Sequence, residues 1–311
     1  MSDVLTIGEA MASVRTRSPL ALGGAATLSV AGSESNVAIG LARLGHDVAW
    51  AGVVGADQPG SLIHRTLRAE GVDTGFLRCT DEAATGFIAF DQAAHDITRV
   101  SYHRARSAGS TLTREDCLAA LGALSPTLLH LTGITCALSA GAQEGILAAA
   151  RSAHEAGTLV SLDVNYRSRL WSRARAEGAL RELLPWVHTV FASEDELDLL
   201  SPAEHPAADL LAGGVAEVVV TAGAAGAHCH TSAGSVYQPA LPATVVDSIG
   251  AGDAFVSGYL SALLDGLAPG DRLRRAATSG ACCVGVYGDW EGLPSREDLT
   301  LLARGNGHAL R

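Results

Sequence analysis

The sequence contains no lysine, since all 22 of its basic residues are arginine. A P-loop uses a lysine to contact the β- and γ-phosphates, and protein kinases use a lysine on a strand. Pyridoxal enzymes and Schiff-base aldolases use a lysine amine as their nucleophile. All four classes are therefore excluded.

Several other signals are missing. There is no G-x-G-x-x-G and no H-E-x-x-H, and the eleven histidines are scattered without ligand spacing, so a dinucleotide-binding fold or a zinc site has little support. The six cysteines form no C-x-x-C pair, and the neighbours Cys282 and Cys283 cannot easily bridge each other. We expect reduced thiols and a cytoplasmic protein.

Long apolar runs and basic clusters are also missing. No run reaches the roughly 20 apolar residues of a membrane span, and the N-terminus passes into a strand without a basic leader. The net charge is −11, with the arginines spread along the chain. We therefore expect no membrane and no nucleic acid as partner, and a small anionic substrate held by a few local arginines.

What is present is an alternation of short apolar runs and amphipathic segments, in a chain that is 48% hydrophobic. Strands are predicted at 4–7, 48–54, 128–132, 159–164, 187–192 and 218–221, and helices at 34–44, 60–70, 113–124 and 143–155. This order predicts an α/β fold with a mostly parallel sheet covered by helices on both faces. Ligands bind beyond the carboxyl ends of the strands in such folds.

Two regions interrupt the alternation. Residues 11–30 and about 85–107 contain short strands with polar or glycine-rich turns, and 86–90 with 99–102 resemble a hairpin. We interpret them as a small β lid able to cover an active site. The alternative is an ordinary hairpin at the edge of the main sheet.

The segment 246–255 carries the most informative motif, Val-Asp-Ser-Ile-Gly-Ala-Gly-Asp-Ala-Phe. A glycine-bracketed turn leads into a helix, and backbone N–H groups at a helix N-terminus attract anions. The carboxylate of Asp253 in the first turn opposes that attraction unless it takes a proton from a substrate, as the base of a phosphoryl-transfer enzyme does. The alternative is a simple helix-capping aspartate.

Two further polar segments accompany this turn. The small-residue loop at 31–36 presents Gly32, Ser33 and Asn36, and its side chains could bind hydroxyl groups or merely cap the helix that follows. Asn165 and Arg167 follow a predicted strand, where the guanidinium could bind a carboxylate or pair locally with Asp163.

Together, these loops resemble the paired signatures of the ribokinase-like (PfkB) carbohydrate kinases, in order and spacing along the whole chain. The resemblance implies one kinase domain over 1–311. The string Asp-x-Asn-Tyr-Arg-x-x-Leu-Trp at 163–171 resembles the 2-keto-3-deoxygluconate kinase branch, as does Tyr102-His103-Arg104, although His103 stands where many relatives have a second tyrosine. Ser248 and Ile249 also depart from the usual pair of threonines, so potassium dependence is not carried over.

The resemblance implies transfer of phosphate from MgATP to the terminal hydroxyl of 2-keto-3-deoxygluconate. Asp253 would be the base, and the amides of Gly250, Ala251 and Gly252 would stabilise the transferred charge. The residues expected to bind the sugar acid are Gly32, Ser33, Asn36, Tyr102, Arg104, Asn165, Arg167 and Asp253, with the two arginines on the carboxylate.

The resemblance also implies a nucleotide site formed by Ser193, Glu196, Thr221, Gly223, Gly226, Gly250 and Gly252, with Glu196 reaching magnesium through water. Ser193 and Glu196 also fit a helix capping box. The alternatives are a fructokinase or another ribokinase-like enzyme, a non-catalytic binding relative, or a dinucleotide-dependent oxidoreductase. We further expect a homo-oligomer that forms through the lid.

Overall fold

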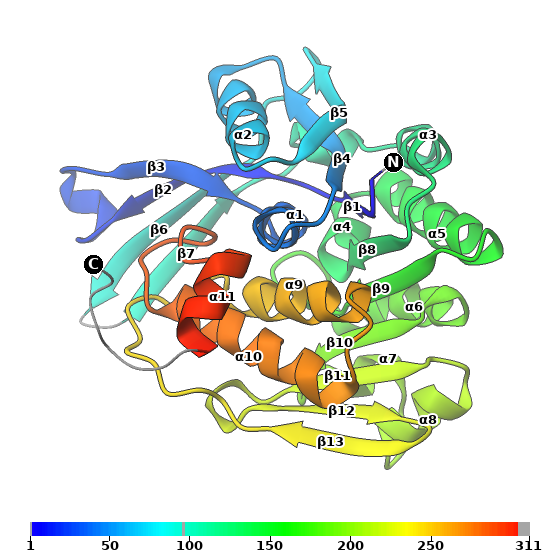
Figure 1. Cartoon of the computed structure of the whole chain (residues 1–311). Coiled ribbons are helices and arrows are strands. Elements are labelled where there is room, and N and C mark those ends of the chain that lie inside the picture. The colour runs from blue at the N-terminus through cyan, green and yellow to red at the C-terminus, as the bar shows by residue number, and fades with distance from the viewer. Residues whose placement is uncertain (1, 95–96, 304–311) are drawn as a thin grey trace.

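A nine-stranded sheet forms the centre of the molecule in the computed structural model, which describes residues 2–94 and 97–303 (Figure 1). Its order is β13-β12-β11-β10-β9-β8-β1-β4-β5. The strands are β1 (Val4–Ile7), β4 (Val48–Gly55), β5 (Asp73–Thr80), β8 (Leu128–Thr132), β9 (Leu159–Asp163), β10 (Thr189–Ser193), β11 (Glu217–Thr221), β12 (Ala227–Thr231) and β13 (Gly234–Gln238). All pairs from β5 to β11 are parallel, and β12 and β13 are antiparallel. The predicted parallel sheet is confirmed.

Helices cover both faces of this sheet, as predicted (Figure 1). One face carries α1 (Ser33–Arg43), α2 (Gln58–Ala69), α9 (Ala251–Leu264) and α10 (Pro269–Val284). The other carries α3 (Arg114–Leu124), α4 (Gly133–Leu138), α5 (Ala140–Glu155), α6 (Arg173–Leu183), α7 (Leu197–Leu200) and α8 (Pro206–Ala212). The remaining helix is α11 (Arg296–Ala303), and single 3₁₀ turns lie at Leu20–Leu22, Ala108–Thr111, Leu184–Trp186 and Gly223–Ala225.

Across the described ranges, no helix is both long and apolar enough to span a bilayer.

Helix caps explain where the predicted helix boundaries differ from those observed. The helix predicted from residue 60 begins earlier, at Gln58, because the Asp57 side chain accepts a hydrogen bond from the Gly60 amide (2.8 Å). The helix predicted from residue 143 likewise begins at Ala140, after the Ser139 cap.

A separate small sheet lies to one side of the main sheet (Figure 1). Its order is β3 (Thr27–Ala31), β2 (Met11–Thr16), β6 (Phe87–Ala94) and β7 (Ile97–His103). The β2–β3 and β6–β7 pairs are antiparallel, whereas β2 and β6 are parallel. The expectation of a small separate β element is confirmed, and the edge-hairpin alternative is wrong. Within the predicted range 85–107, residues 95–96 lie outside the described residues.

The connection between the two sheets positions the site. The chain leaves β1 at Ile7 and enters β2 at Met11, so β2 begins at the carboxyl edge of the main sheet. Strands β8, β9 and β10 end at the same edge because they are parallel to β1 and to one another. Side chains that follow these strands are therefore gathered beneath the small sheet.

Candidate active site

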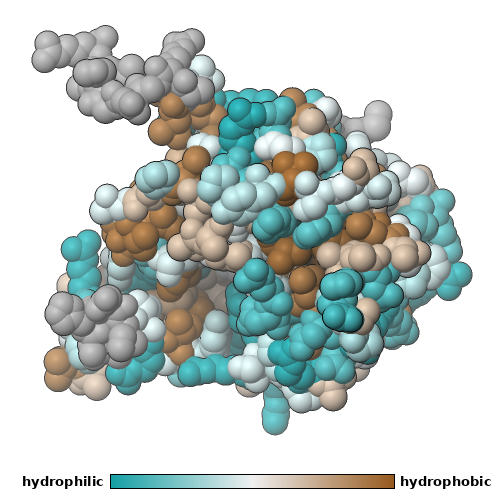
Figure 2. Space-filling model, turned by 90° about the horizontal axis from the view of Figure 1, so that it is seen from below, coloured by the Kyte–Doolittle hydropathy of each residue, from teal (hydrophilic) through white to brown (hydrophobic). Residues whose placement is uncertain are grey.

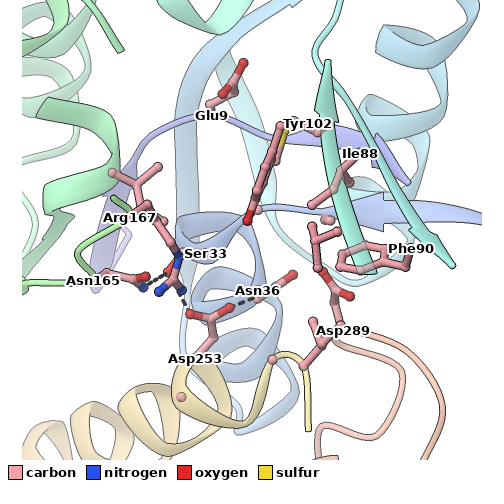
Figure 3. Close-up of a pocket in the computed structure, with 18 of the residues that line it drawn as sticks. Glu9, Ser33, Asn36, Ile88, Phe90, Tyr102, Asn165, Arg167, Asp253 and Asp289 are labelled. Atoms are coloured by element: carbon pink, nitrogen blue, oxygen red, sulfur yellow. Dashed lines mark hydrogen bonds between the residues drawn. The ribbon is translucent and has the colours of Figure 1, made fainter. Parts of the chain in front are cut away.

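A cavity of about 300 Å³ lies between the carboxyl edge of the main sheet and the small sheet (Figure 3). Segments from most of the chain contribute to it. Its lining includes Glu9, Met11, Gly32, Ser33, Asn36, Ile88, Phe90, Val100, Tyr102, Arg104, Asn165, Arg167, Ser248, Ile249, Gly250, Gly252, Asp253 and Asp289. The volume suits a single small molecule.

Asp253 lies at the bottom of this cavity, in the first turn of α9 (Figure 3). Gly250 immediately precedes the helix with φ +79°, a left-handed conformation that favours glycine. Ser33 Oγ donates to Asp253 Oδ1 (2.6 Å) and Asn36 Nδ2 donates to Oδ2 (2.8 Å). Burial raises the pKa of Asp253, while these two hydrogen bonds and the charge of Arg167 oppose that rise.

The start of α1 brings both donors to Asp253. Gly32 is the N-cap of α1 with φ +156°, and a Cβ there would lie 2.5 Å from the Glu9 carbonyl oxygen. Asn36 lies inside the helix, so the alternative that it caps α1 is wrong. The predicted sugar ligands Ser33 and Asn36 thus lie in the cavity, and both hold the carboxylate of Asp253.

The segment after β9 forms a second wall. Asn165 adopts φ +41°, and its Nδ2 donates to Ser33 Oγ and to Asp163 Oδ2, both at 3.0 Å. Burial, helped by the nearby charges of Glu196 and Asp253, raises the pKa of Asp163 to about 8. Asp163 is therefore mostly protonated at neutral pH and adds little negative charge to the cavity.

Arg167 points toward Ser33 and Asp253 (Figure 3). Its Nη1 donates only a long hydrogen bond to the Tyr166 carbonyl (3.4 Å), and Arg167 forms no ion pair within 2–94 and 97–303. The local Arg167–Asp163 pair that we considered as an alternative is absent from these residues. Arg167 therefore presents a cation to the cavity.

Arg104 has different surroundings. It is buried and forms an ion pair with the fully buried carboxylate of Glu9, which also accepts a hydrogen bond from Ser107. Glu9 thus neutralises the charge of Arg104, although both residues line the cavity. The ring of Tyr102 lies on the small-sheet side with Ile88 and Phe90, where the three side chains form an apolar wall (Figure 3).

The residues predicted to hold nucleotide lie at neighbouring strand ends. Ser193 ends β10 and pairs in register with Thr221, which ends β11. The Glu196 carboxylate accepts from the amides of Tyr166 (2.6 Å) and Ser193 (2.9 Å), so it joins the ends of β9 and β10. Helix α7 begins only at Leu197, so the capping box alternative for Ser193 and Glu196 is only half formed.

The glycines of this region have distinct environments. Gly223 has φ +54° and its Cα faces open space, whereas a Cβ on Gly226 would lie 2.3 Å from the Gln238 carbonyl oxygen. Gly226 is therefore required for a tight turn before β12, whatever else it does. Gly252, at the start of α9, also faces open space.

The turn before α9 has free amide donors. The Ala251 amide makes a long hydrogen bond to the Ser248 carbonyl (3.4 Å), and α9 proper begins with the Ala254 amide donating to Gly250. Within the described part of the chain, the Gly250 and Gly252 amides have no backbone acceptor. Such unpaired amides at a helix N-terminus form a site for an anion.

The acidic residues set a limit on metal binding. Nowhere in the described ranges do three or more His, Cys, Asp or Glu side chains cluster in a way that could hold a metal ion. Both oxygens of Glu196 already accept backbone hydrogen bonds. A magnesium ion carried by a phosphate group would therefore reach Glu196 only through water.

Sequence reasoning missed several residues of the cavity. Glu9 follows β1 at the carboxyl edge of the sheet, a position that could have identified it. Asp289 follows α10 without a recognisable motif, and Ile88 and Phe90 appeared only as strand residues. Only folding brings Asp289 beside Gly250. A Cβ atom added to Gly250 would lie 1.9 Å from the Asp289 carbonyl oxygen.

Sequence comparisons identify relatives along nearly the whole chain. The family model described as pfkB family carbohydrate kinase matches residues 1–296. The chain is 35% identical to 2-dehydro-3-deoxygluconokinase of Bacillus subtilis (strain 168), over 96% of this chain and 94% of the relative. It is 36% identical to 2-dehydro-3-deoxygalactonokinase of Haloferax volcanii (83% of each chain) and 33% identical to fructokinase of Klebsiella pneumoniae (86% and 90%).

Solved structures of carbohydrate kinases of this kind superpose on nearly the whole chain. A PfkB protein from Polaromonas sp. JS666 superposes with a TM-score of 0.86 at 34% identity, covering 97% of this chain and all of that chain. Fructokinase with bound ATP from Xylella fastidiosa superposes with a TM-score of 0.85 at 26% identity, covering 98% of this chain and 99% of that chain.

Proposed function

The chain belongs to the pfkB family of carbohydrate kinases, and on that premise we propose that it phosphorylates 2-keto-3-deoxygluconate at its terminal hydroxyl with MgATP. The product is 2-keto-3-deoxy-6-phosphogluconate. The observation that carries the proposal is the half-buried carboxylate of Asp253, which lies in the first turn of α9 close to the Gly250 and Gly252 amides. It shares its cavity with Arg167, a cation that has no ion-pair partner in the described ranges.

The geometry of Asp253 supports a role as general base. Ser33 and Asn36 each donate to a different carboxylate oxygen, so each oxygen keeps a lone pair for a substrate hydroxyl. Asp253 accepts the hydroxyl proton as the sugar oxygen attacks the γ-phosphorus and the bond to the ADP oxygen breaks. The Gly250 and Gly252 amides and the α9 dipole stabilise the charge on the transferred group.

ATP and magnesium are part of the proposal. Relatives with solved structures bind ATP, and the apolar residues Val245, Val246 and Val286 are exposed beside the turn that precedes α9. Exposed apolar side chains next to an anion site suit the flat base of a nucleotide. One face of the molecule is hollowed, with hydrophobic residues along one side of the hollow (Figure 2). Bound magnesium neutralises phosphate charge, and Glu196 would hold it through water.

A sugar acid is the proposed substrate because Arg167, a cation of the cavity, has no ion-pair partner within 2–94 and 97–303. Glu9 neutralises Arg104, so the two arginines are unequal, and Arg167 supplies most of the attraction for a carboxylate. Tyr102 and Asn165 contact the sugar from the small sheet and from the segment after β9. Two of the most similar relatives carry names of kinases that act on such acids.

The experiment is a coupled assay for ADP with 2-keto-3-deoxygluconate, its galactonate epimer and fructose, on the wild type and Arg167→Ala. We expect turnover on the acids. In the variant we expect KM for the acids to rise by roughly 10- to 100-fold, the loss of a charge-assisted pair worth about 1.5 to 3 kcal/mol, with little change for fructose.

A matched control is Arg151→Ala, which removes an exposed arginine paired with Glu155 on α5. The control loses the same unit of charge, so its KM values should stay at the wild-type level. Wild-type turnover on fructose alone, or an equal loss on fructose and the acids in Arg167→Ala, would favour a neutral-sugar kinase such as the fructokinase relatives.

Three further features belong to the proposal. The small sheet acts as a lid that excludes water from the cavity during transfer. Copies of the chain associate through it, since Leu20, Leu22 and Leu28 are exposed there. The six cysteines are all unpaired, which supports action in the reducing cytoplasm.

A further inference from the structure

A buried arginine of the small sheet reaches the turn that precedes α9. The side chain of Arg15, on β2, is 2% exposed. Its Nη1 donates to Asp247 Oδ2 at 2.6 Å, and its Nη2 forms an ion pair with Asp289. The guanidinium also stacks on Phe90 of β6, 3.9 Å from the ring centroid. Arg15 does not line the cavity and is outside the set of residues proposed to touch the sugar.

Both residues whose carboxylates bind Arg15 shape the turn that precedes α9. Asp247 Oδ1 accepts from the Ile249 amide (3.1 Å), inside the turn itself. The Asp289 carbonyl oxygen lies against Gly250, where it leaves no room for a Cβ. Arg15 therefore joins the two pieces of chain that hold Gly250 in its left-handed conformation.

The segment around Asp289 has a second and a third link to the small sheet. Trp290 Nε1 donates to the Val30 carbonyl (3.2 Å), and Ser29 Oγ donates to Glu291 Oε1 (2.6 Å). Both partners belong to β3. A movement of β2 and β3 away from the cavity would pull on 289–291 and hence on the turn.

The positive charge of Arg15 distinguishes it from the other contacts between the small sheet and the turn, because it neutralises two carboxylates. Asp247 and Asp289 are buried, and both stand beside amides that would receive a triphosphate. Without the guanidinium, these carboxylates would repel that anion and would lose their paired cation. Arg104, which is also buried, pairs with Glu9 instead.

We propose that Arg15 is a positioning residue that couples the small sheet to the phosphate-binding turn, so that a sugar held beneath the sheet strengthens nucleotide binding at the turn. The proposal rests on the kinase function proposed above. By reciprocity, nucleotide binding strengthens sugar binding by the same factor.

The test is calorimetric titration with the β,γ-imido analogue of ATP and magnesium, with and without saturating 2-keto-3-deoxygluconate. In the wild type we expect the sugar to tighten analogue binding by about 10-fold, a common size for coupling between sites. In Arg15→Met this factor falls to about 1. Arg15→Lys keeps the charge but not the two-pronged geometry, so an intermediate factor is expected.

The control is Arg272→Met, which removes another largely buried arginine, paired with Glu217 far from the turn. It should lower the melting temperature and leave the coupling factor at its wild-type value. If Arg15→Met fails to fold, the coupling factor measured for Arg15→Lys tests the proposal. An unchanged factor in the Arg15 variants, or no coupling in the wild type, overturns the proposal.

Two separate experiments distinguish failure of this proposal from failure of the proposed function. The ADP assay on the wild type tests the substrate, and the titration tests the role of Arg15. If turnover occurs only on fructose, the titration is run with fructose, and its outcome still decides the role of Arg15.

Discussion

At the scale of single residues, the carboxylates of the site have unequal protonation. Burial raises the pKa of both Asp163 and Asp253, and the charge of Arg167 opposes this rise at both carboxylates. Asp253 also accepts hydrogen bonds from Ser33 and Asn36, which favour its ionised form, whereas Asp163 accepts one from Asn165. Asp163, with Glu196 and Asp253 as neighbours, has a pKa of about 8. The arrangement keeps one carboxylate neutral and leaves the other as the base.

We therefore expect Asp253→Asn to lower kcat by about 10² to 10⁴ with little change in KM for ATP, because the proton acceptor is lost while the amides of the turn remain. Steady-state kinetics would measure this. Asp198→Asn, at an exposed carboxylate on α7, is a matched control that should keep wild-type kcat. Near-normal turnover in Asp253→Asn would remove that residue from the role of base.

The pH dependence follows from the same carboxylate. A base acts in its ionised form, and burial raises the pKa of Asp253 above 3.8, so activity is lost as the pH falls through that raised pKa. We expect the acidic limb of kcat/KM to lie nearer neutrality than that of an ordinary aspartate. A limb at about pH 4, or a limb that persists in Asp253→Asn, would contradict this assignment.

At the scale of elements, the start of α9 has two glycines with different structural requirements, the N-cap Gly250 and Gly252 in the first helical turn. Gly250 is left-handed and packed against Asp289, whereas Gly252 is helical and faces open space. The first glycine is needed for the fold of the turn. The second is needed only if a ligand approaches that space, as the phosphates of ATP would.

We expect Gly250→Ala to destabilise the protein by at least about 1 to 3 kcal/mol, through backbone strain and the clash with Asp289, and to abolish most activity. Gly252→Ala is the matched control. It should leave the free energy of unfolding unchanged or raise it by about 0.5 to 1 kcal/mol, yet increase KM for ATP. Denaturant unfolding and kinetics measure both variants, and an unaltered KM in Gly252→Ala would argue against phosphate binding at this turn.

At the scale of the whole molecule, the small sheet has an open edge. Strand β3 is at one edge of this sheet. Leu28 lies on β3 and is 60% exposed, and Leu22 lies before the strand and is 78% exposed. An edge strand with exposed apolar residues readily pairs with another copy. The same sheet contacts the turn before α9 through Arg15, so the proposed association and the proposed phosphate transfer would involve one element.

We expect the wild type to sediment as an oligomer in analytical ultracentrifugation, and Leu28→Glu to sediment as a monomer, since a charge in the contact opposes association. Leu302→Glu, at an exposed leucine of α11, should remain oligomeric. A wild type that sediments as a monomer at micromolar concentration would end the proposal of association through the small sheet.

Much of this protein follows from local sequence. The alternation of apolar runs and amphipathic segments predicted the parallel sheet because strand and helix periodicities are local properties. The segment 246–255 and the loop at 31–36 were identified as candidate binding elements because glycine spacing and helix starts are local as well. The family was predicted from the resemblance of these loops, in their order along the chain, to those of the PfkB kinases, and that resemblance implied the kinase chemistry.

The pairing of charges was decided only by the tertiary structure. Arg104 was expected to bind substrate, and it lines the cavity, but the fold also pairs it with Glu9. Arg15 contacts Asp247, which lies 232 positions further along the chain. Each arginine could pair with any of several carboxylates, and nothing in local sequence ranks those pairs. Long-range packing selects them, because a buried charge must find its partner wherever the folded chain brings one.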